Sequence, residues 1–427
     1  MCKKGISLFL GFIRHTVVKN TIALYGVTFV NYLLPFIAVP YLARVLGPAQ
    51  LGMVILAHTL GIWLSIIIEY GFSFSTARDV AQNKQDHNSI SIIVAGVFGA
   101  KIVLVFIAFV ITFFLVLFVP TFQKDPIIFW LSFFYCIALG FLPIWYFQGI
   151  ELLAVPSLIN ILLKSIGLIP VFIWVKKPED AWLVMVFQTV AAFLSTMVLV
   201  FWMYRAITPL WPKFSWIKKA FHSGFYLFLF SLAGSVYSTA NVLILGLFVS
   251  PAQVGYYGGA EKIHRAFSSV FGPIGQSFYP YIIRMLKVNK PRGVLIAQKT
   301  LLLMIILGII MGLIVGLGAP YWIELFLGDK YVNSVSILLI LAIQLPLTAI
   351  SRILGVQWML PLNMDRYFST IVIIAGVLNI LLVVLFVPYG GIIGMAWAFI
   401  LTELFITASM CYVVRNTGIF NLKASTQ

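Results

Sequence analysis

Apolar runs bounded by charges, glycines or prolines follow one another along the whole chain. Each run reaches the length of about 20 residues that an α-helix needs to cross a bilayer. No window alternates with period two, as the strands of a membrane β-barrel do. We therefore predict an all-α polytopic membrane protein with about twelve transmembrane helices. The predicted spans lie near residues 20–43, 49–73, 90–119, 127–149, 154–175, 181–204, 223–248, 255–282, 296–321, 334–357, 367–388 and 391–414.

The composition agrees with this pattern. The chain has 427 residues, of which 62% are hydrophobic and 9% are charged, whereas soluble proteins carry about 25% charged residues. The three cysteines are an odd number, so the sequence does not predict a disulfide framework. The short apolar run Ile6–Ile13 is followed by Arg14 without a cleavage motif, and we interpret it as an interfacial helix before the first span.

The charge distribution predicts how the chain is oriented. The formal net charge is +16, and most Lys and Arg residues fall in the connections on the same side as the two termini. The opposite connections carry only Arg44, Lys124, Lys176, Lys177 and Lys330. Because basic residues concentrate in cytoplasmic loops, we predict that both termini are cytoplasmic and that the charge does not serve nucleic-acid binding.

The two halves of the sequence resemble each other. The segment Gly47–Gly52 reads GPAQLG, and the segment Ser250–Gly255 reads SPAQVG after the seventh predicted span. A shared helix-start preference for proline is the alternative explanation. The longest connection, near 205–222, lies between the halves. We predict an N-terminal six-helix bundle at 1–212 and a C-terminal six-helix bundle at 213–427, related as a parallel repeat with the substrate between them.

Two predicted spans carry polar stripes. In the second span, His58, Ser65 and Glu69 share one helix face. In the eighth span, the corresponding helix face carries Glu261, His264 and Ser268. Polar residues in spans either bond neighbouring helices together or face a hydrated cavity. Stripes on two repeat-related helices favour the cavity.

The eighth span also contains Lys262 and Arg265. The spacing of Glu261 and Arg265 predicts an intrahelical ion pair as the alternative to a substrate role, and it leaves Lys262 without a partner on this helix. Lys164, Arg352 and Glu403 are further candidates for charges inside the membrane, with snorkelling or structural pairing as the alternative.

Helix-breaking residues mark candidate hinges in two spans. The candidates are Pro35 and Pro40 in the first span, and Gly272, Pro273 and Gly275 in the eighth. Glycine and proline are common in membrane helices, which is the alternative explanation.

The aromatic cluster Trp145-Tyr146-Phe147 lies near a predicted span end, where we expect aromatic residues to anchor the helix at the bilayer interface. Stacking on sugar rings is the alternative. The sequence contains no Walker-type loop, no metal-spaced His/Cys cluster and no nucleophile elbow, so we predict a transporter with no cofactor rather than an enzyme.

Three motifs give the sequence a family resemblance. They are Tyr41–Gly52, Trp145–Glu151 and Val254–Ile263, and with the length and the duplication they resemble the polysaccharide transporter family. That family includes the O-antigen flippases and belongs to the multidrug/oligosaccharidyl-lipid/polysaccharide exporter superfamily. The resemblance implies a twelve-helix protein of the bacterial inner membrane that moves undecaprenyl-diphosphate-linked O-antigen units from the cytoplasmic to the periplasmic leaflet by alternating access.

The resemblance also implies partners and substrate contacts. The partners are the lipid-linked oligosaccharide, membrane lipid, a polysaccharide polymerase and a chain-length regulator. A cationic cavity like that of related flippases would here use Arg78, Lys262 and Arg265. We expect Glu69, Glu261 or His264 to serve proton coupling. A cation-coupled drug exporter of the same superfamily and a membrane-embedded glycan polymerase or glycosyltransferase are the alternatives; the first needs acidic cavity residues and the second a large outward loop.

Overall fold

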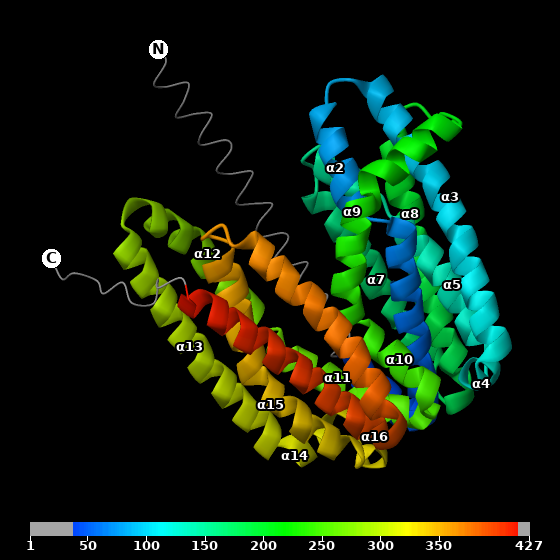
Figure 1. Ribbon diagram of the computed structural model, residues 1–427. Helices are drawn as coiled ribbons and strands as arrows, with labels where there is room; N and C mark the ends of the chain where they lie inside the picture. The colour runs from blue at the N-terminus through cyan, green and yellow to red at the C-terminus, as the bar shows by residue number, and fades with distance from the viewer. Residues whose placement is uncertain (1–36, 417–427) are drawn as a thin grey trace. The chain divides into compact units, whose positions relative to one another are not determined.

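The computed structural model describes residues 37–416, apart from a few side chains between 230 and 280. All regular elements in this range are helices (Figure 1), which confirms the predicted all-α class. Eight helices in the described range are long and apolar enough to cross a membrane. Two of them contain a break, at Gly47 and at Gly391, where φ is positive. The predicted number of twelve spans is compatible with this arrangement. The predicted interfacial helix Ile6–Ile13 and Pro35 lie outside the described residues.

The chain divides into two compact units, one built from residues 57–232 and the other from residues 39–56 together with 233–416. The predicted boundary at residue 212 stays a prediction. After a helix over residues 37–69 that breaks at Gly47, the first half contains α2 (Phe72–Gln82), α3 (His87–Phe118), α4 (Pro120–Gln123), α5 (Pro126–Gly140), α6 (Ile144–Gly149), α7 (Ala154–Trp174), the short 3-10 helix η1 (Pro178–Asp180) and α8 (Ala181–Tyr204).

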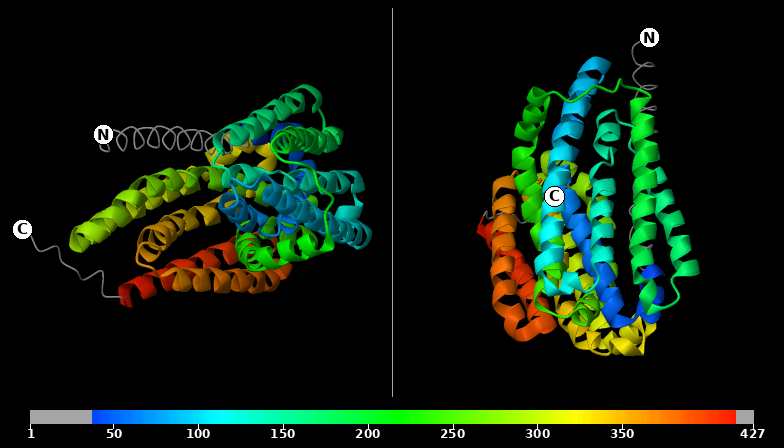
Figure 2. Two further views of the ribbon diagram at one scale, coloured as in Figure 1. Left: turned by 90° about the horizontal axis from the view of Figure 1, so that it is seen from above. Right: turned by 90° about the vertical axis from the view of Figure 1, so that its right-hand side faces the viewer.

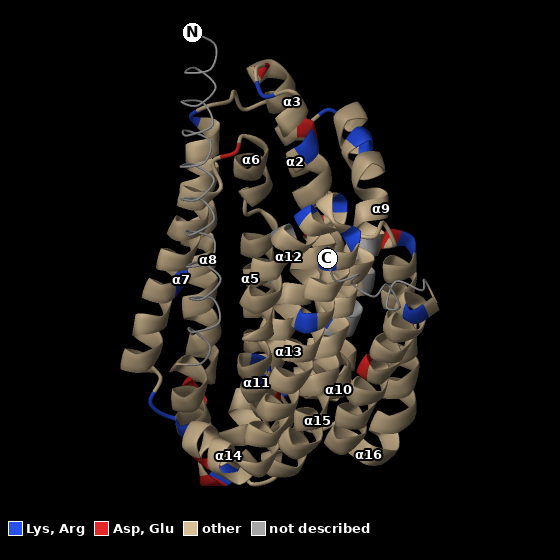
Figure 3. Cartoon of the chain, turned by 90° about the vertical axis from the view of Figure 1, so that its left-hand side faces the viewer, with Lys and Arg blue, Asp and Glu red and all other residues tan. Residues whose placement is uncertain are grey.

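The second half begins with α9 (Phe214–Ser238), whose last residues belong to the second unit. The elements that follow are α10 (Ala240–Phe248), α11 (Pro251–Ser268), α12 (Phe271–Val288), α13 (Lys290–Leu317), α14 (Ala319–Leu327), η2 (Asp329–Tyr331), α15 (Ser334–Ile353), the π-helical segment η3 (Leu354–Met359) and α16 (Asp365–Asn416). Figure 3 shows that charged residues are sparse along these helices, as a membrane environment requires.

The short helix α6 of the first unit is buried, although its aromatic residues were predicted to lie at the bilayer interface. α6 packs on α2, where a side chain at Gly149 would collide with Val80. Trp145, Tyr146 and Phe147 of α6 are only 1%, 3% and 1% exposed. The prediction that these three side chains anchor the protein at the bilayer interface is therefore wrong, because the helix that carries them is buried inside the unit.

A lysine lies in the core of the same unit. Lys101 of α3 is 0% exposed, and its Nζ donates a hydrogen bond to the carbonyl oxygen of Gly140 at 2.6 Å. Gly140 is the last residue of α5, so the ammonium meets the negative end of that helix dipole. The rings of Phe72, Phe141 and Trp145 lie 5.7–6.0 Å from the same nitrogen. The helix end and the aromatic faces together compensate a buried cation.

The second unit is built around the pair α13 and α15, which lie side by side (Figure 2). Gly308, Gly312 and Gly316 recur every fourth residue of α13, so they form one helix face. A Cβ on Gly308 would approach Ala349 of α15 within 2.9 Å, and one on Gly312 would approach the Ala342 carbonyl oxygen within 3.1 Å. The missing side chains allow the two backbones to come close, and this seam holds α15 in place.

Candidate functional site

A cavity of about 300 Å³ lies inside the second unit, between α11, α15 and α16. Its polar wall comes from α11 and α15, and its apolar wall comes mainly from Phe368, Phe399 and Met410 of α16. Pockets for small ligands combine a largely apolar lining with a few placed polar groups. The cavity therefore has the composition of a ligand site within helices that are otherwise apolar.

The polar side of α15 follows the helical repeat. Gln344, Thr348, Ser351 and Arg352 line the cavity at spacings of four, seven and eight residues, which places them on one helix face. Arg352 is exposed and has no carboxylate within ion-pair distance in the described part of the chain. α15 passes into the π-helical segment η3 directly afterwards, and such segments are frequent at functional sites.

α11 contributes the second arginine. Nη2 of Arg265 donates to Oε1 of Glu261 at 2.8 Å, one helical turn away. The Glu261 side chain is 4% exposed, whereas the Arg265 side chain is 43% exposed and lines the cavity. The intrahelical pair that the spacing predicts is present in the structure. It compensates the buried carboxylate and leaves part of the guanidinium facing the cavity.

The acidic residue of the cavity has a hydroxyl partner. Oε1 of Glu403 on α16 accepts a hydrogen bond from Oγ of Ser351 at 2.5 Å, and Glu403 is 4% exposed. The contact joins α16 to the polar face of α15. The lining thus contains two arginines and one glutamate, so cationic groups outnumber acidic ones.

Several buried polar atoms of the lining have no hydrogen-bond partner among the described residues. They are both ring nitrogens of His264, Oε1 of Gln344 and Oγ1 of Thr348. His264 and Gln344 are 3% and 2% exposed. A buried polar group without a partner costs about 1–3 kcal/mol, and unpaired groups in native structures call for an explanation. They give the cavity polar groups that the described residues leave unsatisfied.

The predicted polar residues of the eighth span divide into two groups. His264, Arg265 and Ser268 line the cavity together, and Glu261 is joined to them through its ion pair. Lys262 is half-buried and is not part of the lining. Its role as a substrate-binding cation stays a prediction.

The stripe of the second span makes local contacts inside the first unit. Nε2 of His58 lies 3.4 Å from the hydroxyl of Tyr135, and Oγ of Ser65 donates to the carbonyl of its own helix at Ile62 at 2.7 Å. Glu69 accepts a hydrogen bond from Ser73. Each of these three polar side chains thus has a partner within the first unit. The role of this stripe in a hydrated cavity stays a prediction.

The third predicted cation belongs to another cavity. Arg78 of α2 lines a space in the first unit that is bounded by α2, α3 and α9, and this lining shares no residue with the cavity of Arg265.

The hinge candidates of the eighth span lie next to a break in the helix. α11 ends at Ser268 and α12 begins at Phe271, so Gly272 and Pro273 fall in the first turn of α12. The carbonyl of Gly275 accepts a hydrogen bond from Nε2 of Gln357 at 2.6 Å. Pro40 lies within helical residues before the break at Gly47. Movement at these positions stays a prediction.

The sequence pattern did not lead us to predict three residues of the cavity, Gln344, Thr348 and Ser351. Their spacing with Arg352 is visible in the sequence, so a search for polar residues at helical intervals would have found this face. The sequence does not show, however, that it packs against the face of α11 that carries Arg265.

Solved structures with the same fold are transport proteins. A lipid II flippase, MurJ, in an inward closed conformation matches with a TM-score of 0.73 at 13% identity, covering 95% of this chain and 90% of that one. An inward-facing multidrug resistance MATE transporter of the MOP superfamily matches with a TM-score of 0.58 at 12% identity, covering 93% of this chain and 100% of that one. The chain therefore shares its fold with this flippase and this multidrug transporter, and its long apolar helices make it a multi-pass membrane protein.

The sequence comparisons identify the family. Residues 17–286 match the family described as polysaccharide biosynthesis protein. An Escherichia coli K12 protein is 31% identical over 406 residues, which cover 93% of this chain and 96% of the relative. A Shigella dysenteriae protein is 26% identical over 404 residues, covering 93% and 100%. Both relatives carry the name "Putative O-antigen transporter". The chain belongs to the polysaccharide biosynthesis protein family.

Proposed function

We propose that this protein is a flippase that moves undecaprenyl-diphosphate-linked O-antigen units, or related polysaccharide units, from the cytoplasmic to the periplasmic leaflet by alternating access. The observation that carries the proposal is the cavity of the second unit, where Arg265 and Arg352 lie beside the unpaired polar atoms of His264, Gln344 and Thr348. The names of the two relatives support the O-antigen cargo.

The chemistry of the cargo explains why such a cavity is needed. A diphosphate carries about two negative charges, and an isolated ionised group costs tens of kcal/mol to bury in hydrocarbon by the Born estimate. Guanidinium groups bind phosphate oxygens in a bidentate way, so two arginines offset much of this cost. The orphaned amide, hydroxyl and imidazole groups provide hydrogen bonds of the kind that a sugar or a phosphate ester completes.

The charge distribution supports a place in the bacterial inner membrane with both termini in the cytoplasm. In that orientation the membrane potential favours outward movement of the anionic head group by about 2.3 kcal/mol per charge per 100 mV. His264 and Glu261, which lie in or beside the cavity, are the proton-coupling candidates, with Glu69 in the other unit. A polysaccharide polymerase and a chain-length regulator are the protein partners that this role predicts.

Two other functions fit the observations less well. A cation-coupled drug exporter needs acidic groups at its site, whereas the single lining carboxylate, Glu403, is already bonded by Ser351. A glycan polymerase or glycosyltransferase needs a sizeable extramembrane loop with catalytic groups. Between the described helices the connections are short, and the longest, over residues 205–213, carries no Asp, Glu or His.

The proposal is tested in the host from which the gene comes. The gene is deleted, and lipid-linked oligosaccharides are quantified in each leaflet with and without a plasmid copy. We expect complete units to accumulate on the cytoplasmic side of the deletion strain and the plasmid to restore export. Complete units in the periplasmic leaflet of the deletion strain, with only their polymerisation lost, would identify a polymerase instead.

A further inference from the structure

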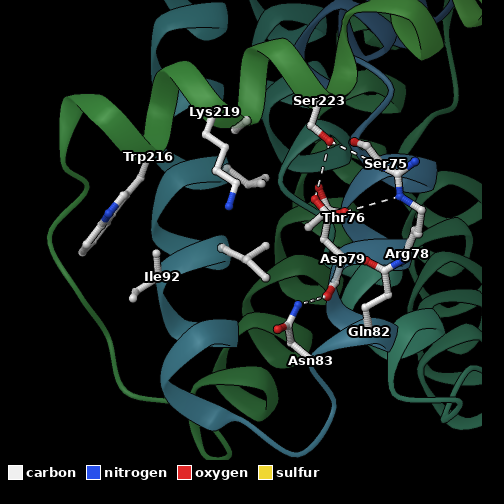
Figure 4. Close-up of a pocket in the computed structure, with 13 residues that line it drawn as sticks. Ser75, Thr76, Arg78, Asp79, Gln82, Asn83, Ile92, Trp216, Lys219 and Ser223 are labelled. Atoms are coloured by element: carbon white, nitrogen blue, oxygen red, sulfur yellow. Dashed lines mark hydrogen bonds and ion pairs between the residues drawn. The ribbon is translucent and has the colours of Figure 1, made fainter.

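The first unit contains a second charged cavity, separate in its lining from the proposed substrate site. It has a volume of about 340 Å³ and lies between α2, α3 and α9 (Figure 4). This size is at the lower end of the range of about 300–1,000 Å³ found for small-ligand sites. α2 supplies a polar wall, α3 supplies Ile92, Ile93 and Val97, and α9 supplies Lys219 and Ser223.

Two cations of this cavity are only weakly engaged by the protein. Arg78 makes contacts of 3.4 Å with Asp79 and with Ser223, and its side chain is 59% exposed. The amine of Lys219 points into the space that the α2 side chains face (Figure 4). In the described range, Lys219 has no carboxylate within ion-pair distance. The hydroxyl of Thr76 adds a donor to these two cations, whereas the hydroxyls of Ser75 and Ser223 donate to the carbonyl oxygen of Gly71 and to Asp79. Two cations with a hydroxyl donor are the chemistry that phosphate oxygens require.

Close packing holds the α9 wall of this cavity in place. A Cβ at Gly96 of α3 would lie 2.8 Å from the carbonyl oxygen of Trp216, and one at Gly99 would lie 2.7 Å from Pro212. The preceding connection is also fixed, because the amide of Thr208 donates to Oγ of Ser91 at 3.2 Å. These contacts fix the backbone of the α9 wall against α3.

The residues next to the cavity indicate that a phosphate group bound there would come from a lipid. Trp211 is 92% exposed and Phe214 is 81% exposed, and they lie on either side of Lys213 at the start of α9. Exposed aromatic residues mixed with lysines are typical of a segment at the depth of the lipid head groups. The isoleucines of α3 provide an apolar wall for the first carbons of an acyl chain. Basic pockets between membrane helices on the cytoplasmic side bind anionic head groups.

We propose that this cavity binds the phosphate ester of an anionic phospholipid, held between Arg78 and Lys219. Its lining shares no residue with that of the proposed substrate cavity, and lipid binding here does not depend on the proposed function. A bound lipid would join α9 to α2, and Asp79 would accept hydrogen bonds from the hydroxyls of a glycerol head group.

The test uses the purified full-length chain in a neutral detergent without any cargo. Lipid binding is followed by native mass spectrometry and by the unfolding temperature during titration with dioleoylphosphatidylglycerol. Dioleoylphosphatidylcholine tests the charge of the lipid, and glycerol 3-phosphate tests whether a soluble phosphate ester is sufficient. The variants are Lys219→Ala and Arg78→Ala, and the matched control is Lys218→Ala, an exposed neighbour that does not line the cavity.

We expect phosphatidylglycerol to bind and to raise the unfolding temperature of the wild type and of Lys218→Ala alike. Lys219→Ala and Arg78→Ala each raise the half-saturating concentration by about tenfold, as the loss of one charge-assisted hydrogen bond predicts. Equal affinities for Lys219→Ala and Lys218→Ala would overturn the site. Equal binding of phosphatidylcholine would overturn the claim that the site selects an anionic lipid. An equal effect of glycerol 3-phosphate would overturn the claim that the ligand is a lipid rather than a soluble phosphate ester.

Discussion

Gly52 packs directly against the carbonyl oxygen of Pro251, and Gly255 packs in the same way against the carbonyl oxygen of Pro48. The four residues are the corresponding positions of the two sequence repeats. Each repeat also begins a helix in the second unit: Gly47 has φ of +71° just before Pro48, and Ser250 caps α11 just before Pro251. The repeats thus meet in a reciprocal contact in which each glycine lies on the other repeat's backbone.

This contact predicts a strong effect of adding one methyl group. Gly52→Ala and Gly255→Ala each place a Cβ on a carbonyl oxygen that the helix start holds in position, so the helices must move apart. We expect each variant to lose about 1–3 kcal/mol of unfolding free energy, the usual cost of overpacking. Equilibrium unfolding in mixed detergent micelles measures it.

Gly234→Ala is the matched control, because a Cβ at Gly234 of α9 has no neighbour within 4 Å. It should be neutral or stabilising by up to about 1 kcal/mol, since alanine is the better helix former. Equal stability of Gly52→Ala and Gly234→Ala would show that the two repeats are not in close contact.

The buried lysine gives a second prediction. Lys101→Ala should destabilise the protein by about 3 kcal/mol or more, because it removes a charge-assisted hydrogen bond to Gly140 and leaves a cavity. Lys101→Met keeps most of the side-chain volume, so we expect it to lose less unfolding free energy than Lys101→Ala. The same micelle unfolding assay compares the two, and a Met variant that is the less stable of the pair would contradict the packing contribution.

The loop before α3 gives a prediction about pH. Asp86 caps this helix by accepting hydrogen bonds from the Ser89 hydroxyl at 2.6 Å and from the Ser89 and Asn88 amides at 3.0 Å. These bonds hold the pKa of Asp86 below its ordinary value of 3.8. A lowered folded-state pKa means that the cap contributes fully above the ordinary value and is lost as pH falls through the lower, folded value.

Hydrogen exchange measures this effect. After correction for intrinsic rates, protection at the start of α3 should fall only below about pH 4 in the wild type. Asp86→Asn should show no such step, because its side chain does not titrate. A step of the same size in Asp86→Asn would assign the pH dependence to another group.

The membrane potential gives a further prediction for transport. Two negative charges that move outward gain about 2.3 kcal/mol each per 100 mV, so export of the cargo should accelerate severalfold when the destination side is made positive. Proteoliposomes with an imposed potassium diffusion potential measure this rate. A rate that stays the same when the potential is set to zero would mean that the potential does not drive export.

The sequence predicted much of the fold because apolar length is the dominant constraint in a bilayer. The break at Gly47 and the helix that starts at Pro251 follow from local preferences of glycine and proline, so they were readable as well. The burial of Trp145 was not, because an aromatic cluster at a span end looks the same whether it faces head groups or a neighbouring helix.

The candidate site was predicted only in part. His264, Arg265 and Ser268 share a face of one helix, which periodicity reveals. The contribution of Arg352, the pairing of Ser351 with Glu403 and the orphaned Gln344 depend on which faces of α11, α15 and α16 meet. The shapes of the packed helix surfaces, such as the glycine seam of α13, determine which faces meet. The periodicity of a single sequence does not contain this information.

The most direct test of the central claim is the flipping rate of undecaprenyl-diphosphate oligosaccharide in proteoliposomes that contain Arg352→Ala. This substitution breaks no ion pair found in the described structure, and Arg366→Ala, an exposed arginine of α16 outside the lining, is its control. We predict that Arg352→Ala slows flipping by about tenfold or more, that Arg352→Lys recovers part of the rate, and that Arg366→Ala matches the wild type. A wild-type rate in Arg352→Ala would contradict the assignment of this cavity to the anionic head group.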